Sequence, residues 1–167
     1  MDLKLTLADR MTYYIDIQLA CGAPLPFTDE QLHHWVTLAL TPYRDTAELT
    51  LRFVDVDEIM QLNTTYRKIN KATNVLAFPA TYPKDVELEY PLLGDVIICP
   101  CVLKQESIDL NKPLESHWAL IVMHGVLHLL GYDHINDDDA NIMQSIETNL
   151  LKQLGFNNPY ESDSEDN

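Results

Sequence analysis

Three histidines lie within eleven consecutive residues, at His124, His128 and His134. The first two are four residues apart, so on a helix they project from the same face. Gly131 allows the helix to end in a left-handed turn, which brings His134 back over that face. Three protein nitrogens that converge from one side, with a fourth position open, describe a catalytic zinc site. The spacing therefore predicts one bound metal ion, which we expect to be Zn²⁺.

The residue between the first two histidines limits the chemistry. The spacing HxxxHxxGxxH also occurs in the metzincin proteases, whose pattern is HExxHxxGxxH. Their general base would stand at position 125, where this chain has Gly125, so a protease would lack its base. The plainer alternative of three ordinary buried histidines is disfavoured by the spacing and by Gly131. Asp133 either orients a histidine ligand from behind or is a surface aspartate after the turn.

The remaining histidines are left out of the site. We expect His33 and His34 on the exposed part of an amphipathic helix, and we take His117 to have a different helical phase from His124. Nickel, copper and iron also accept imidazole ligands, so the sequence alone does not fix the metal.

The composition is that of one soluble globular domain. The chain has 167 residues, of which 46% are hydrophobic and 22% charged. Three cysteines without zinc-ribbon spacing indicate reduced thiols and a cytoplasmic protein. The apolar segment from Trp118 to Leu130 is too short to span a bilayer. The net charge of −15 disfavours non-specific coating of nucleic acid, although part of the excess lies in the tail.

We expect a single domain over residues 11–156, with an N-terminal extension at 1–10 and an acidic, disordered tail at 157–167. Alternating or continuous apolar residues predict strands at 13–19, 49–53, 74–78 and 95–99, and the last is apolar enough to be central. Helical spacing and end signals predict helices at 28–42, 55–67, 113–131 and 137–154, with a loop at 81–91.

The order of these elements predicts an α+β fold. We expect a small mixed four-stranded sheet covered by about five helices, with the metal site on the penultimate helix and the turn after it. Thr28 with Gln31, and Asp55 with Glu58, should cap the first two helices. The second of these helices delivers Arg67 at its end. Arg67, Lys68 and Lys71 form the densest positive cluster in this acidic chain, and we expect them on the rim of the metal site.

Three motifs carry a resemblance to a known family. They are the run His124-Gly-Val-Leu-His-Leu-Leu-Gly-Tyr-Asp-His134, the pair Leu62-Asn-Thr-Thr-Tyr-Arg67 and Thr73-Asn-Val-Leu-Ala-Phe-Pro79, and Leu93-Gly-Asp-Val-Ile-Ile-Cys99. Over roughly residues 13–160 the chain resembles the YbeY endoribonucleases, the bacterial rRNA maturation factors. Ala77 stands where that family usually has serine, and residues 1–10 have no counterpart.

The resemblance implies a metal-dependent endoribonuclease specific for single-stranded RNA. It implies a role in 3′-end maturation of 16S rRNA and in late quality control of 70S ribosomes. It implies His124, His128 and His134 as metal ligands and Arg67 as the functional arginine. The implied partners are the ribosome and ribosomal or GTPase assembly factors, with no part for DNA or a membrane.

A mechanism follows from these residue types. Zinc held by three histidines would polarise a phosphoryl oxygen or lower the pKa of a water molecule. Arg67 would bind the phosphate and stabilise the added charge of the transition state. Lys68 and Lys71 would extend the path of the RNA. Either water or a ribose 2′-hydroxyl is the nucleophile. The alternatives are a hydrolase of another bond, such as a peptide or ester, and a non-enzymatic ribosome-assembly factor with a structural zinc.

Overall fold

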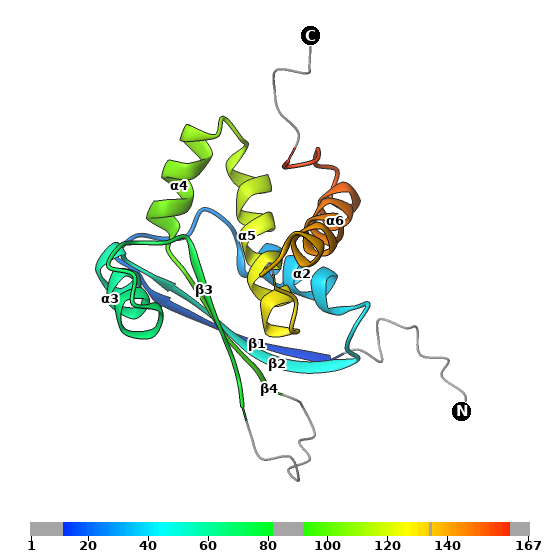
Figure 1. Ribbon diagram of the computed structural model, residues 1–167, viewed down its shortest axis with the longest axis horizontal. Helices are drawn as coiled ribbons and strands as arrows, with labels where there is room; N and C mark the ends of the chain where they lie inside the picture. Colours follow the sequence, from blue (N-terminus) through cyan, green and yellow to red (C-terminus); the bar gives the residue numbers. More distant parts are fainter. Residues whose placement is uncertain (1–11, 82–91, 134, 161–167) are drawn as a thin grey trace, which may run out of the picture.

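A mixed four-stranded sheet forms the centre of the molecule, with strand order β1-β2-β4-β3. The computed structural model describes residues 12–81, 92–133 and 135–160. The strands are β1 (Thr12–Ala20), β2 (Thr46–Val54), β3 (Val75–Pro79) and β4 (Leu92–Ile98), and β3 alone runs antiparallel to its neighbour. The helices of the described residues are α2 (Asp29–Leu40), α3 (Val56–Arg67), α4 (Pro100–Asp109), α5 (Leu114–Leu129) and α6 (Asp137–Gln153) (Figure 1). The predicted α+β architecture is confirmed.

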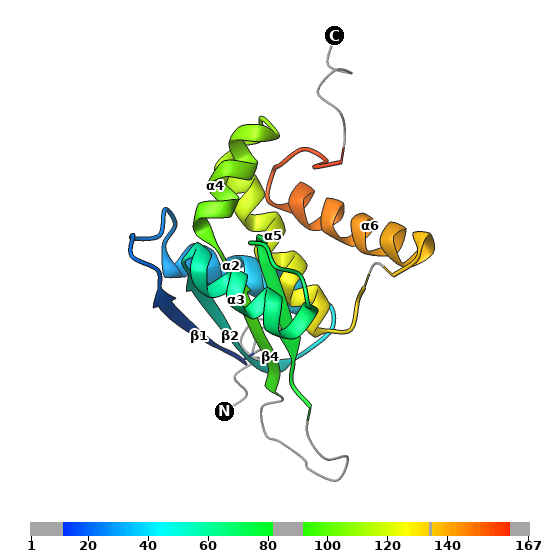
Figure 2. The same cartoon turned by 60° about the vertical axis from the view of Figure 1, so that its left-hand side comes forward.

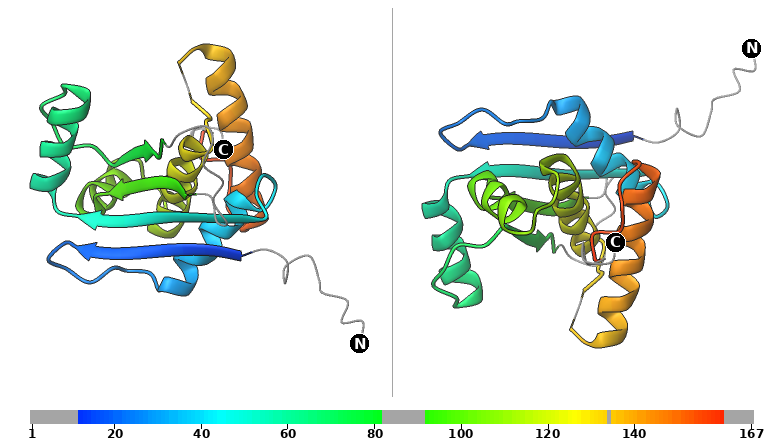
Figure 3. Two further views of the ribbon diagram at one scale, coloured as in Figure 1. Left: turned by 90° about the horizontal axis from the view of Figure 1, so that it is seen from below. Right: turned by 90° about the horizontal axis from the view of Figure 1, so that it is seen from above.

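Helices cover both faces of the sheet. Successive side chains of the central strands point to opposite faces, and both faces are apolar. In β2, Leu49, Leu51 and Phe53 point into the larger core, which α2 and α5 close. Val54 points into a smaller core on the other face, where it meets Ile59 of α3. Figure 3 shows α3 and α6 at opposite sides of the molecule. The prediction that β4 is central and apolar is confirmed.

Helix α5 lies at the centre of the packing. It contacts β3 and β4 as well as α2, α4 and α6. From Ile121 to Leu129 every side chain except those of His124 and His128 is buried. Gly125 lies against the sheet, where an added Cβ would come within 2.5 Å of Val96 Cγ1. A side chain at this position would have to displace Val96, so the glycine that stands in place of a protease base also allows α5 to approach β4.

Sequence analysis misses one helix and predicts one helix cap wrongly. Helix α4 was not predicted, because it has little apolar periodicity and buries only Leu103 and Ser107. Helix α3 does begin after Asp55, but the predicted side-chain cap is wrong. The Asp55 carboxylate instead accepts a hydrogen bond from the Gly22 amide, and Glu58 pairs with an arginine of β2. The capping box at the start of α2 is confirmed.

Several predictions fall outside the described residues. They are the extension at 1–10, nearly all of the loop at 81–91, the end of the tail at 161–167, and His134. Residues 157–160, expected in the disordered tail, do lie within the described part, and Figure 2 shows the segment after α6 doubling back over that helix. Within the described ranges, no helix is long and apolar enough to cross a membrane.

Candidate metal centre

A pocket of about 600 Å³ opens where α5, β3 and the end of α3 meet. It brings together Arg67, His124, His128 and Asp133, which are far apart in the sequence. The other lining residues come from α3, from β3 and from the loop between them: Tyr66, Thr73, Asn74, Val75, Leu76, Ala77 and Phe78. Ala77 is one of the β3 residues in this wall, at the position where the family that the chain resembles usually has serine.

The two histidines of α5 present nitrogens to one point. Their ring centroids are 4.5 Å apart, and 3.0 Å separates His124 Nε2 from His128 Nε2. Two histidine ligands of one tetrahedral zinc ion have nitrogens roughly 3.3 Å apart, given Zn–N bonds of 2.0–2.1 Å. The separation of these two Nε2 atoms therefore fits a shared metal ion.

A buried carboxylate stands behind the first histidine. Glu147 of α6 is 1% exposed, and its Oε2 lies 2.6 Å from His124 Nδ1. A neutral imidazole that donates from Nδ1 keeps its lone pair on Nε2, the atom that faces His128. Such a carboxylate behind a ligating histidine is the usual outer partner in zinc sites. The electrostatics of the pair thus favour a cation at Nε2.

Sequence reasoning missed Glu147, although a signal was present. Helical spacing predicts that Met143, Ile146 and Leu150 share one face of the last helix, and Glu147 lies on that same face. A carboxylate on a buried face must have a partner, because an unpaired buried charge costs several kcal/mol. The sequence does not reveal that the partner is His124, since the two residues lie on different helices.

Arg67 is the last residue of α3 and is exposed on the pocket wall. Among residues 12–81, 92–133 and 135–160, no carboxylate forms an ion pair with it. Lys68 ends the helix in a left-handed conformation with φ 61°, and its Nζ donates to the Thr65 carbonyl. Lys71 is exposed. Within the described chain, the pocket lining includes Arg67 and neither lysine.

The described part of the centre holds two of the three predicted ligands. Gly131 has φ +104°, so the chain does leave α5 through the predicted left-handed turn. His134 lies outside the described residues, and no group of three histidine, cysteine, aspartate or glutamate side chains suited to a metal occurs within them. Asp133 lines the pocket beside the two histidines. Its expected role behind a ligand stays a prediction.

Comparisons with known proteins agree with the motifs. A family model described as Endoribonuclease YbeY matches residues 25–155. Curated proteins called Endoribonuclease YbeY from the Corby, Lens and Paris strains of Legionella pneumophila are each 58% identical over 151 residues, covering 90% of this chain and 96% of the relative. The solution structure of TM1509 from Thermotoga maritima shares the fold, with TM-score 0.55 and 23% identity over 88% of this chain and 97% of that one. This chain belongs to the YbeY endoribonuclease family.

Proposed function

We propose that this chain is a metal-dependent endoribonuclease that cleaves single-stranded RNA. The observation that carries the proposal is one pocket in which His124 Nε2 and His128 Nε2 converge beside the Arg67 guanidinium. Family membership supports the finer proposal that the substrate is the 3′ region of 16S rRNA, with a further role in late quality control of 70S ribosomes. The site of action is then the cytoplasm, with ribosomal or GTPase assembly factors as partners.

The metal we propose is zinc, held by His124, His128 and His134. Neutral imidazoles suit zinc, and the buried carboxylate behind His124 supports a cation on the other side of that ring. When bound, a zinc ion supplies Lewis acidity and a source of hydroxide near neutral pH. That supply accounts for cleavage without a protein carboxylate at position 125.

Arg67 is proposed to bind the scissile phosphate. Its planar guanidinium can hold two phosphate oxygens at once, and the charge it meets grows in the transition state. In a chain of net charge −15, an arginine without a carboxylate partner in the described residues is a local site of positive potential. Lys68 and Lys71 follow it directly and extend that potential along the proposed RNA path.

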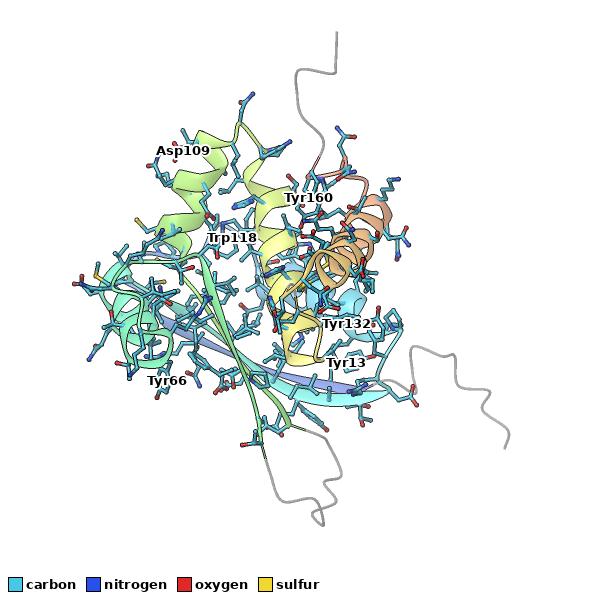
Figure 4. The ribbon with its side chains drawn as sticks, viewed as in Figure 1. Tyr13, Tyr66, Asp109, Trp118, Tyr132 and Tyr160 are labelled. Atoms are coloured by element: carbon cyan, nitrogen blue, oxygen red, sulfur yellow. The ribbon has the colours of Figure 1, made fainter. Side chains whose placement is uncertain are left out.

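Tyr66 supplies a surface for an unpaired base. Tyr66, labelled in Figure 4, is 64% exposed. Its ring lines the pocket with Arg67 and packs edge-to-face on Phe78, with centroids 5.1 Å apart. Exposed aromatic rings stack single-stranded bases, whereas bases in a duplex are already stacked on their neighbours. This position supports a preference for unpaired RNA.

Two rival functions are less well supported. A peptide hydrolase of the related zinc type needs a glutamate at position 125, where this chain has a glycine packed against Val96. A structural zinc site is closed by a fourth protein ligand, whereas the pocket beside His124 and His128 leaves space for a substrate.

The test is RNA cleavage by the zinc-loaded chain and by two matched arginine variants. Arg67→Ala should lower the cleavage rate about a hundredfold or more, because it removes a transition-state contact worth ~3 kcal/mol. Zinc content and unfolding midpoint should stay unchanged. Arg44→Ala, which removes an exposed arginine outside this pocket, should keep full activity.

The substrate panel pairs an unstructured RNA with a hairpin of the same composition and with casein. We expect cleavage of the unstructured RNA alone. Equal cleavage of the unstructured RNA and the hairpin would contradict the proposed role of Tyr66. An equal loss of cleavage rate in Arg67→Ala and Arg44→Ala would contradict the proposed role of Arg67. Cleavage of casein in place of RNA would contradict the function itself.

A further inference from the structure

The carboxylate behind His124 is held at both of its oxygens. Glu147 Oε2 meets His124 Nδ1 at 2.6 Å, and Glu147 Oε1 accepts a hydrogen bond of 2.7 Å from the Tyr160 hydroxyl. The three groups come from α5, from α6 and from the segment after α6. Because Glu147 is 1% exposed, water does not take the place of either partner readily.

The direction of the tyrosine hydrogen bond is fixed by chemistry. Desolvation of its hydroxyl beside the buried Glu147, and then the charge and hydrogen bonding of Glu147, raise the pKa of Tyr160 above its ordinary value, although the residue is 46% exposed. The phenol therefore stays protonated, and its O–H has to donate to the carboxylate. An ionised Glu147 accepts at both oxygens, and a neutral His124 ring that donates to it carries its proton on Nδ1.

The segment that carries Tyr160 is fastened to α6. The Asn158 side chain accepts a hydrogen bond of 2.8 Å from the Tyr160 amide. It also lies 3.4 Å from the Thr148 hydroxyl, one residue after Glu147 in α6. Figure 4 shows Tyr160 at the end of this returning segment. The match to the family model ends at residue 155, five residues before Tyr160.

We propose that Tyr160 is a positioning residue of the metal centre, and that the segment after α6 completes that centre. The Tyr160 hydroxyl holds Glu147, and Glu147 holds the His124 ring with Nε2 toward the pocket. The inference rests on the proposed metal site. Removal of the hydroxyl leaves one buried carboxylate oxygen without a donor, so the carboxylate can turn and the histidine loses its fixed orientation.

The experiment measures zinc affinity of the full chain by competition with a chelating dye. Tyr160→Phe should weaken zinc binding about tenfold, the lower end of the range for outer partners of a metal ligand. Tyr13→Phe is the matched control, because it also removes a bonded phenol hydroxyl, here donated to the Arg44 carbonyl, and should bind zinc as the wild type does. Asn158→Ala keeps the Tyr160 ring but removes the side chain that holds its segment to α6. It should also lower the zinc affinity.

A second readout needs no metal. In ¹⁵N spectra of the zinc-free chain, His124 should occupy the tautomer protonated at Nδ1, and Tyr160→Phe should give a mixture of tautomers. Equal zinc affinity of wild type and Tyr160→Phe, with one zinc bound by each, would overturn this inference while leaving the proposed function standing. A wild-type chain that binds no zinc, or a His124→Ala variant that keeps it, would overturn both.

Discussion

Helix α5 carries two histidine–glutamate pairs, and they are built in opposite ways. In the first, the His117 side chain is 6% exposed while that of Glu106 is 33% exposed. In the second, the His124 side chain is 24% exposed while that of Glu147 is 1% exposed. The first pair buries its histidine and lets its carboxylate reach the surface. The second buries its carboxylate and turns its histidine to a pocket.

The ring nitrogen that each pair uses also differs. His117 Nε2 lies 3.0 Å from Glu106, whereas His124 Nδ1 bonds to Glu147 and its Nε2 faces His128. Our expectation that helical phase separates the two histidines is wrong, because seven residues are close to two full turns. The partner of each ring decides its role: Glu106 binds the outer nitrogen of His117, whereas Glu147 binds Nδ1 of His124 and leaves Nε2 facing His128 in the pocket.

Alanine at each histidine gives the largest expected contrast. His124→Ala should abolish zinc binding and RNA cleavage, because the two remaining histidines do not hold the ion. Removal of zinc from the wild type by a chelator should also abolish cleavage. His117→Ala should keep zinc and cleavage but lower the free energy of unfolding by about 1–3 kcal/mol, because it removes a buried ring together with its hydrogen bond to Glu106. Elemental analysis, the cleavage assay and urea unfolding measure the three quantities. Loss of zinc in His117→Ala would remove the distinction between the pairs.

Exchange of each glutamate for glutamine gives the next largest contrast. Glu147→Gln should weaken zinc affinity about 10–100-fold, because a neutral amide neither fixes the His124 tautomer nor adds basicity to the ring. Glu106→Gln keeps a hydrogen-bond acceptor for His117 on a partly exposed side chain, so zinc affinity should not change. Chelator competition on both variants makes the measurement. Equal weakening would mean that the two carboxylates act on the metal site alike.

Local sequence patterns predicted most of the fold and the parts of the site that share one element. The four strands follow from apolar periodicity, and the placement of Arg67 follows from the length of α3. His124 and His128 share a face because they are four residues apart on a helix. The cap at Asp55 failed because its carboxylate has a tertiary partner, the amide of Gly22, that no local pattern reveals.

The parts that sequence analysis missed depend on contacts between elements. Glu147 is meaningful only because α6 packs on α5, and Tyr160 only because the chain folds back over α6. We expected residue 160 in a disordered tail because the sequence around it is polar and acidic, a composition that rarely buries enough apolar surface to order a segment. Here a hydrogen bond to a buried carboxylate gives Tyr160 a defined contact.

The most direct test is a crystal structure of the zinc-loaded chain with anomalous scattering recorded at the zinc edge. We predict one peak about 2.0–2.1 Å from both His124 Nε2 and His128 Nε2, with His134 as the third protein ligand and no fourth. Glu147 should stay bonded to His124 Nδ1, and no peak should lie beside His117. A zinc ion at the His117–Glu106 pair, or one enclosed by four protein ligands, would contradict the account.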